Sequence, residues 1–131
     1  MDFIKLLLPK NKFDDSNIIK ITKLSDEEIQ PIIYDLLEWL QDSNWPIYVK
    51  ILPIVASHQN IVISDIINVL QGDDIMWKYW IICDLIPLLS DENKMLLKSN
   101  LIKLSESQGK DEDTLAIVEV SKNCLDIYYT N

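Results

Sequence analysis

The chain has 131 residues, of which 48% are hydrophobic and only two are glycine, so it is long and apolar enough to fold as a globular domain without disulfides or metals. Its 21 carboxylates stand against 12 lysines and no arginine, which gives a formal net charge of −9. A surface this acidic repels phosphate backbones, so nucleic-acid binding is not expected. The charge suits a basic protein partner, although it also simply favours solubility.

The ends and cysteines of the chain predict a cytoplasmic protein. Its apolar runs stay below the roughly 18 residues of a membrane span, and the N-terminus carries Asp2 where a signal peptide would be positive. Cys83 and Cys124 have neither a CxxC partner nor a nearby histidine, which indicates reduced, buried thiols. We therefore expect no metal, no cofactor and no membrane contact.

The first third of the chain predicts two helices after an irregular start that runs through Phe13. Asp14-Asp15-Ser16 can cap a short helix that ends near Lys23. Ser25 and Glu28 then form a capping box, in which each side chain bonds the other residue's backbone amide. The helix that this box opens has apolar residues along one side: Ile29, Ile32, Ile33, Leu36, Leu37 and Leu40.

The rest of the chain also has helical spacing, interrupted by short polar turns. Pro46 suits the first turn of a helix, Pro53 is expected to bend that helix, and Gly72 ends the next one. The helix after Asp73 and Asp74 is apolar on nearly every side, so we expect it to be buried between neighbours. These later helices are predicted at about 46–57, 62–71, 75–89, 90–105 and 114–128.

Two segments of the chain, 31–46 and 63–77, nearly repeat each other. Each has a helical apolar period, then Leu-Gln, a short Asp- or Asn-rich break, and a Trp that opens a new helix. Repetition at roughly 30–35 residues is typical of stacked helical pairs. We therefore predict a single all-α domain over 1–131, with six to seven helices stacked as antiparallel hairpins in the manner of HEAT or armadillo repeats. Such stacks usually present binding surfaces.

Several motifs in this pattern resemble the bacterial domain-of-unknown-function family DUF5071. The motifs are Leu8-Pro9-Lys10, the segment 24–33, Trp39-Leu-Gln-Asp-Ser-Asn-Trp-Pro46, and Asp73-Asp74 followed by Trp77-Lys-Tyr-Trp80. The resemblance spans nearly the whole chain. It implies an all-helical single domain and brings no activity, catalytic residue or cofactor with it.

The two turns of the repeat supply the candidate binding residues. Trp39 and Trp80 are expected to pack in the core, whereas Trp45 and Trp77, at helix starts, suit packing and partial exposure equally well. The Asp and Asn side chains of the turns suit helix capping. If both turns share one rim, they also form an acidic, Trp-bearing patch for a basic partner. The candidate partner-binding residues are Asp42, Asn44, Trp45, Asp73, Asp74 and Trp77.

Two further polar residues receive structural interpretations. Asp84 lies among apolar residues of its helix, and a buried carboxylate needs a partner, so we expect it to face a groove. His58 is the only histidine and is expected at a helix C-terminus, where its cation would complement the helix dipole. We assign no catalytic residue.

Three hypotheses about function follow. The first is a non-enzymatic protein-binding module of a bacterial cytoplasm, in its most concrete form an immunity protein that neutralises a basic toxin domain. The second is a small enzyme that uses Asp84 or Asp42 as acid or base in an inter-helical groove. The third is a structural subunit that dimerises through apolar helix faces. The sequence alone does not set the partner or the oligomeric state.

Overall fold

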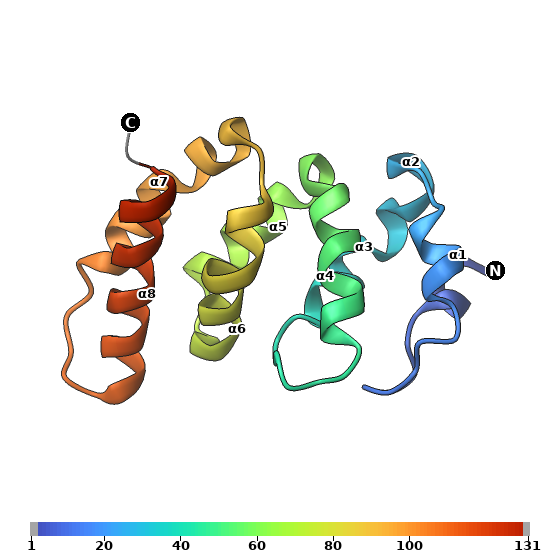
Figure 1. The fold of residues 1–131 in the computed structure, drawn as a ribbon, viewed down its shortest axis with the longest axis horizontal. Coiled ribbons are helices and arrows are strands. Elements are labelled where there is room, and N and C mark those ends of the chain that lie inside the picture. The colour runs from blue at the N-terminus through green and yellow to red at the C-terminus, as the bar shows by residue number, and fades with distance from the viewer. Residues whose placement is uncertain (1–2, 130–131) are drawn as a thin grey trace. The chain divides into compact units, whose positions relative to one another are not determined.

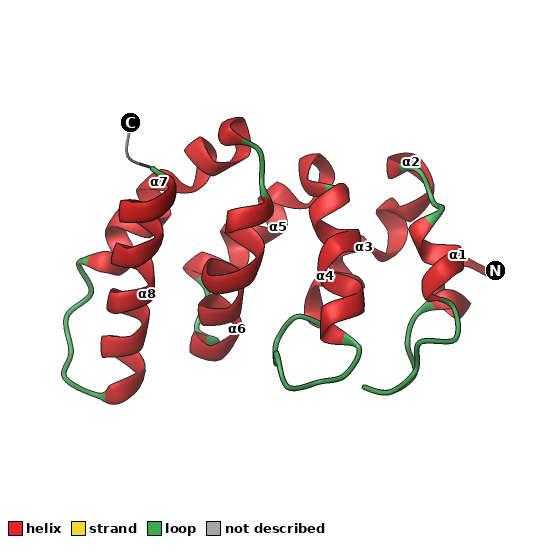
Figure 2. Cartoon of the chain, in the orientation of Figure 1, coloured by secondary structure: helices red, strands yellow, loops and turns green. Residues whose placement is uncertain are grey.

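The computed structural model describes residues 3–129, and every regular element within them is helical (Figure 1, Figure 2). The predicted all-α class is confirmed.

The chain divides into two compact units, residues 1–62 (unit 1) and 63–131 (unit 2). Residues 1–2, the first part of the irregular start expected through Phe13, lie outside the described residues. The single domain with HEAT-like stacking stays a prediction.

Unit 1 is built from short helices around an aliphatic core. All six residues predicted for the apolar side of the helix after Ser25 are buried. The expected irregular start contains a five-residue 3-10 helix, so that prediction was incomplete. In chain order the elements are η1 (Phe3–Leu7), α1 (Ile18–Thr22), α2 (Asp26–Ile29), η2 (Gln30–Ile32), α3 (Ile33–Glu38) and α4 (Tyr48–Ser57).

The capping box at Ser25 is confirmed, but the helix that it opens is broken. The Ser25 hydroxyl accepts the Glu28 amide at 3.2 Å, and the Glu28 carboxylate accepts the Ser25 amide at 2.9 Å. One turn later the backbone tightens into the 3-10 segment η2, which contains Pro31. Proline has no amide hydrogen and its ring crowds the preceding turn, so a regular α-helix cannot continue through this position unchanged.

The next element after α4 is α5. The boundary between the two units lies within this helix. Ser90 caps α7 as predicted, and α8 starts at the cap that the Asp111 side chain provides. The α7 and α8 helices pack side by side (Figure 1). The bounds are α5 (Gln59–Gln71), α6 (Ile75–Trp80), the π-helical η3 (Ile81–Leu85), the 3-10 helix η4 (Ile86–Leu88), α7 (Asp91–Ser105) and α8 (Glu112–Tyr128).

The segment predicted as one apolar helix over 75–89 differs from that expectation in two ways. Its backbone changes from α to π and then to 3-10 geometry, and Pro87 in η4 supplies no amide for a regular helical bond. It is also not buried on every side, because Met76 and Leu88 are each 50% exposed. Its inner side does reach the core through Ile81 and Leu85. Across residues 3–129 no helix has the length and apolarity needed to cross a bilayer.

Candidate functional site

A groove of about 320 Å³ lies in unit 2. One wall comes from α6 and η3, and the other comes from α8, which packs against both. Its volume lies at the lower end of the range of ligand sites, about 300–1,000 Å³. The polar and aromatic side chains that line it are Tyr79, Cys83, Glu119, Asn123, Cys124 and Tyr128.

Helical spacing places these side chains on the facing sides of their helices. Tyr79 and Cys83 are four residues apart, as are Glu119 and Asn123. Residues at i and i+4 lie one above the other on a helix, so each pair projects from one face. Tyr79 also contacts Trp80 edge to face, with ring centroids 5.0 Å apart.

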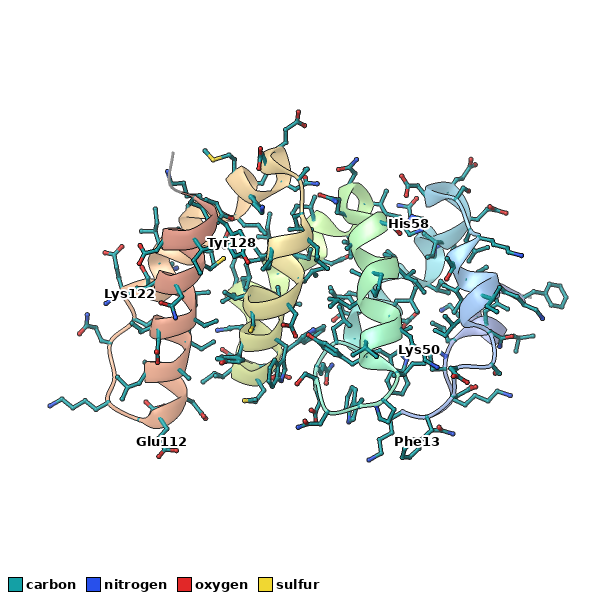
Figure 3. The ribbon with its side chains drawn as sticks, viewed as in Figure 1. Phe13, Lys50, His58, Glu112, Lys122 and Tyr128 are labelled. Carbon is teal, nitrogen blue, oxygen red and sulfur yellow. The ribbon has the colours of Figure 1, made fainter. Side chains whose placement is uncertain are left out.

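Glu119 is the only charged side chain among the described residues that line the groove, and it is exposed. The Tyr128 ring, near one end of α8, has the Lys94 ammonium 5.0 Å from its centroid (Figure 3). The neighbouring Tyr129 hydroxyl donates to the Lys94 carbonyl oxygen at 2.7 Å, which ties the end of α8 to α7. The groove therefore combines aromatic walls with a single accessible carboxylate.

The two thiols of the groove are free, and the prediction that both are buried is correct for Cys124 but wrong for Cys83, which is exposed. Both hold their protons near neutral pH. Burial raises the pKa of Cys83, and the charge of Asp84 and its hydrogen bond to the thiol raise that pKa further. Burial raises the pKa of Cys124 to about 11. Because the thiolate is the reactive form of cysteine, these surroundings do not activate either residue as a nucleophile.

The first turn of the near-repeat lies in unit 1, where it packs against the start of the chain. The Asp42 carboxylate accepts the Asn44 amide at 2.8 Å, and half-buried Trp45 contacts Trp39 edge to face. The Ile47 amide donates to the Lys12 carbonyl oxygen at 3.0 Å. This bond brings Lys12 and exposed Phe13 to the turn, a proximity that the sequence analysis missed.

The second turn lies in unit 2 and acts mainly as a helix cap. Asp74 is the N-cap of α6, and its carboxylate accepts the Trp77 amide at 3.0 Å. The Trp77 side chain is only 8% exposed, so its packing interpretation is the one that the structure supports. Asp73 is exposed. Since the two turns belong to different units, a shared rim stays a prediction.

The sequence of the chain was compared with models of known protein families. A family model described as domain of unknown function (DUF5071) matches residues 7–125. The chain belongs to the DUF5071 family. A search of curated proteins found no match. Membership in DUF5071 confirms the suspected resemblance.

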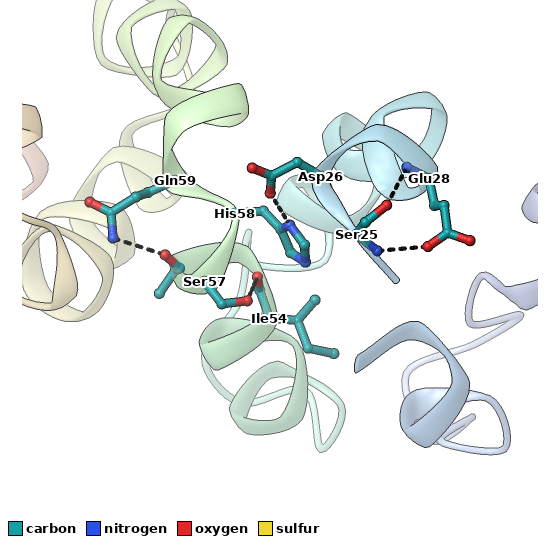
Figure 4. A network of polar contacts seen from close by, with 8 residues as sticks. Ser25, Asp26, Glu28, Ile54, Ser57, His58 and Gln59 are labelled. Atoms are coloured by element: carbon teal, nitrogen blue, oxygen red, sulfur yellow. Dashed lines mark hydrogen bonds and ion pairs between the residues drawn. The ribbon is translucent and has the colours of Figure 1, made fainter. Parts of the chain in front are cut away.

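The single histidine of this DUF5071 chain has a structural setting. His58 is the C-cap of α4 and is buried, and its Nδ1 atom lies 2.5 Å from the Asp26 carboxylate at the start of α2 (Figure 4). The contact joins the ends of two helices within unit 1. Within residues 3–129, no group of three or more His, Cys, Asp or Glu side chains is placed to hold a metal ion.

The two carboxyl groups that the enzyme hypothesis would use lie in different units. Asp84 is half-buried in η3 beside Cys83, but it is not among the residues that line the groove. Asp42 is half-buried in the first turn, where it holds the Asn44 amide. Burial raises the pKa of Glu38 and of Asp65, but neither residue lines the groove.

Proposed function

We propose that the chain is a non-enzymatic protein-binding module that recognises a basic protein in the cytoplasm of a bacterium. The observation that carries the proposal is the distribution of charge. Residues 63–131 contain twelve carboxylates and six lysines, and the groove in this unit presents only Glu119 as a charged lining residue among those described. Complementary charge accelerates the encounter of two proteins and disfavours acidic competitors.

Neutralisation of a basic toxin domain is the most concrete form of this proposal. A small acidic protein can bind such a domain rapidly and block its active surface, and the net charge of −9 suits this steering. In this form the partner is a single basic polypeptide that forms a stoichiometric complex. The chain would protect cells in which that polypeptide is produced.

The proposal is tested by affinity purification from the source cells, followed by measurement of affinity for the purified partner. We expect a basic partner that binds at a fixed stoichiometry, with an association rate that falls steeply as salt rises, because screening removes long-range attraction. A partner set that is neutral or acidic, or an association rate that does not change with salt, would contradict it.

One observation favours the alternative of a structural subunit. Met95, Leu96 and Ile102 of α7 are 59%, 56% and 40% exposed. Apolar side chains grouped on an exposed helix can mark an interaction surface. Sedimentation at high protein concentration tests this role. A dimer that Met95→Lys and Ile102→Lys together dissociate would support it, whereas a monomer at all concentrations would exclude it.

A further inference from the structure

We infer that the groove between α6–η3 and α8 accepts an arginine side chain that the basic partner presents. This inference rests on the proposed function and specifies which chemical group its site would take. The groove is too small to hold a folded segment, and its volume of about 320 Å³ suits one inserted side chain or a short piece of extended peptide.

The charges around the groove favour a cationic guest. Glu119 lies in the lining, and Asp84 forms a hydrogen bond with the Cys83 thiol and raises its pKa. Lys94 is the cation that opposes them, and its ammonium is already held over the Tyr128 ring. Lys122 is exposed on α8 and does not line the groove. The described lining of the groove therefore carries one carboxylate and no cationic side chain.

The walls suit the flat, weakly hydrated guanidinium better than an ammonium. Tyr79 offers a ring on which an arginine can stack, and the side chains of Ile82 and Val120 can cover its aliphatic stem. Glu119 and Asn123 stand one helical turn apart on α8 and both line the groove. Their oxygen atoms can accept several of the five N–H donors that arginine presents in a planar fork.

The inference is tested by titrating the ¹⁵N-labelled full chain with the peptide acetyl-Gly-Arg-Gly-amide and with its lysine counterpart. We expect amide shifts centred on Glu119, Asn123 and Tyr79, and saturation at a lower concentration of the arginine peptide. Glu119→Gln should weaken arginine binding about tenfold, because it removes a charge-assisted hydrogen bond. Shifts spread over other surfaces, or equal responses to both peptides, would overturn the inference.

The matched control is Glu112→Gln, which makes the same change of charge on the same helix. Glu112 lies at the opposite end of α8 from Tyr128 (Figure 3) and does not line the groove. This variant should bind the arginine peptide as the unchanged chain does. If it weakens binding as much as Glu119→Gln, the effect comes from net charge and the groove is not the site.

The failure of this inference can be distinguished from the failure of the proposed function. If a basic protein binds the unchanged chain and Glu119→Gln equally well, and the arginine peptide does not shift the groove residues, the arginine groove is wrong while the binding module stands. If no basic protein partner exists, the proposed function is wrong. The inference that a partner supplies the arginine is then wrong as well, even if the free peptide binds in the groove.

Discussion

The indole rings of Trp39 and Trp45 meet edge to face, with centroids 5.5 Å apart and an interplanar angle of 70°. Trp39 directly follows α3 and Trp45 precedes α4, so the pair closes the turn that joins these helices. Aromatic pairs in this geometry contribute about 0.5–1.5 kcal/mol beyond the area that they bury. Trp45 therefore has a packing role in the turn, whatever its exposed part contacts.

Replacing Trp45 with alanine should lower the free energy of unfolding by about 2–3 kcal/mol, because the side chain is only half-buried and the cost lies below that of a core Trp. Trp39→Ala should cost a similar amount. Urea unfolding of both single variants and the double variant measures their coupling. We expect a coupling of about 0.5–1.5 kcal/mol, and strictly additive effects would show that the ring contact contributes nothing.

Replacement of the two aspartates of the second turn should lower the free energy of unfolding by different amounts. Asp74→Ala should cost about 1 kcal/mol because it removes the cap on the Trp77 amide, whereas Asp73→Ala should stay within about 0.5 kcal/mol. Thermal or urea unfolding checks both values. Equal costs would mean that Asp74 does not act as a cap, and loss of partner binding by Asp73→Ala alone would assign that residue to an interface.

Local chemistry in the sequence was sufficient to predict three helix starts. The cap expected from Asp14-Asp15-Ser16 was wrong, because Asn17 is the N-cap of α1 and makes no side-chain cap bond. Ser25, Asp74 and Ser90 each bond the amide three residues ahead, and that contact depends only on residue type and short spacing. The interior of a helix was harder to predict where proline occurs. Pro31 and Pro87 each occur in a 3-10 segment, and an apolar period alone does not show that change of backbone geometry.

The candidate groove could not be predicted because it depends on long-range pairing. The helical spacing around Tyr79 and Glu119 can be recognised in the sequence. That spacing does not predict that α6 packs against α8 and brings the two residues into one groove. The same limit explains the turns of the near-repeat. Trp45 and Trp77 hold matching positions in the sequence, yet Trp45 is half-buried and Trp77 is buried. Their surroundings are set by residues distant in the chain.

Replacing Ser121 with alanine should stabilise the protein. Its side chain is fully buried on α8, and its hydroxyl has no hydrogen-bond partner among the described residues. Removing an unsatisfied buried hydroxyl and improving helix propensity should together add about 1–2 kcal/mol. Ser99→Ala is the matched control, because Ser99 is exposed in the middle of α7 and reports propensity alone. A gain no larger than that of the control would show that the buried hydroxyl finds a partner in solution.

The buried thiol of Cys124 should make the protein less stable in alkaline solution. Burial raises the pKa of this thiol in the folded state from 9.0 to about 11, although nearby Lys94 lowers it in part. The folded chain therefore keeps a proton that the unfolded chain loses. Stability is fully present below the unfolded pKa and falls as pH rises from 9 to 11. Because solvent screens part of the effect, we expect a loss of roughly 1–2 kcal/mol.

Urea unfolding at pH 8 and pH 10.5 measures this loss, and Cys124→Ala isolates the thiol that causes it. The variant should be less stable at pH 8, because it leaves a small cavity, but its stability should fall less between the two pH values. Burial also raises the pKa of Tyr129, and the charge of Cys124 raises it further, so some alkaline loss will remain in the variant. An identical loss in the unchanged chain and in Cys124→Ala would show that Cys124 does not control alkaline stability.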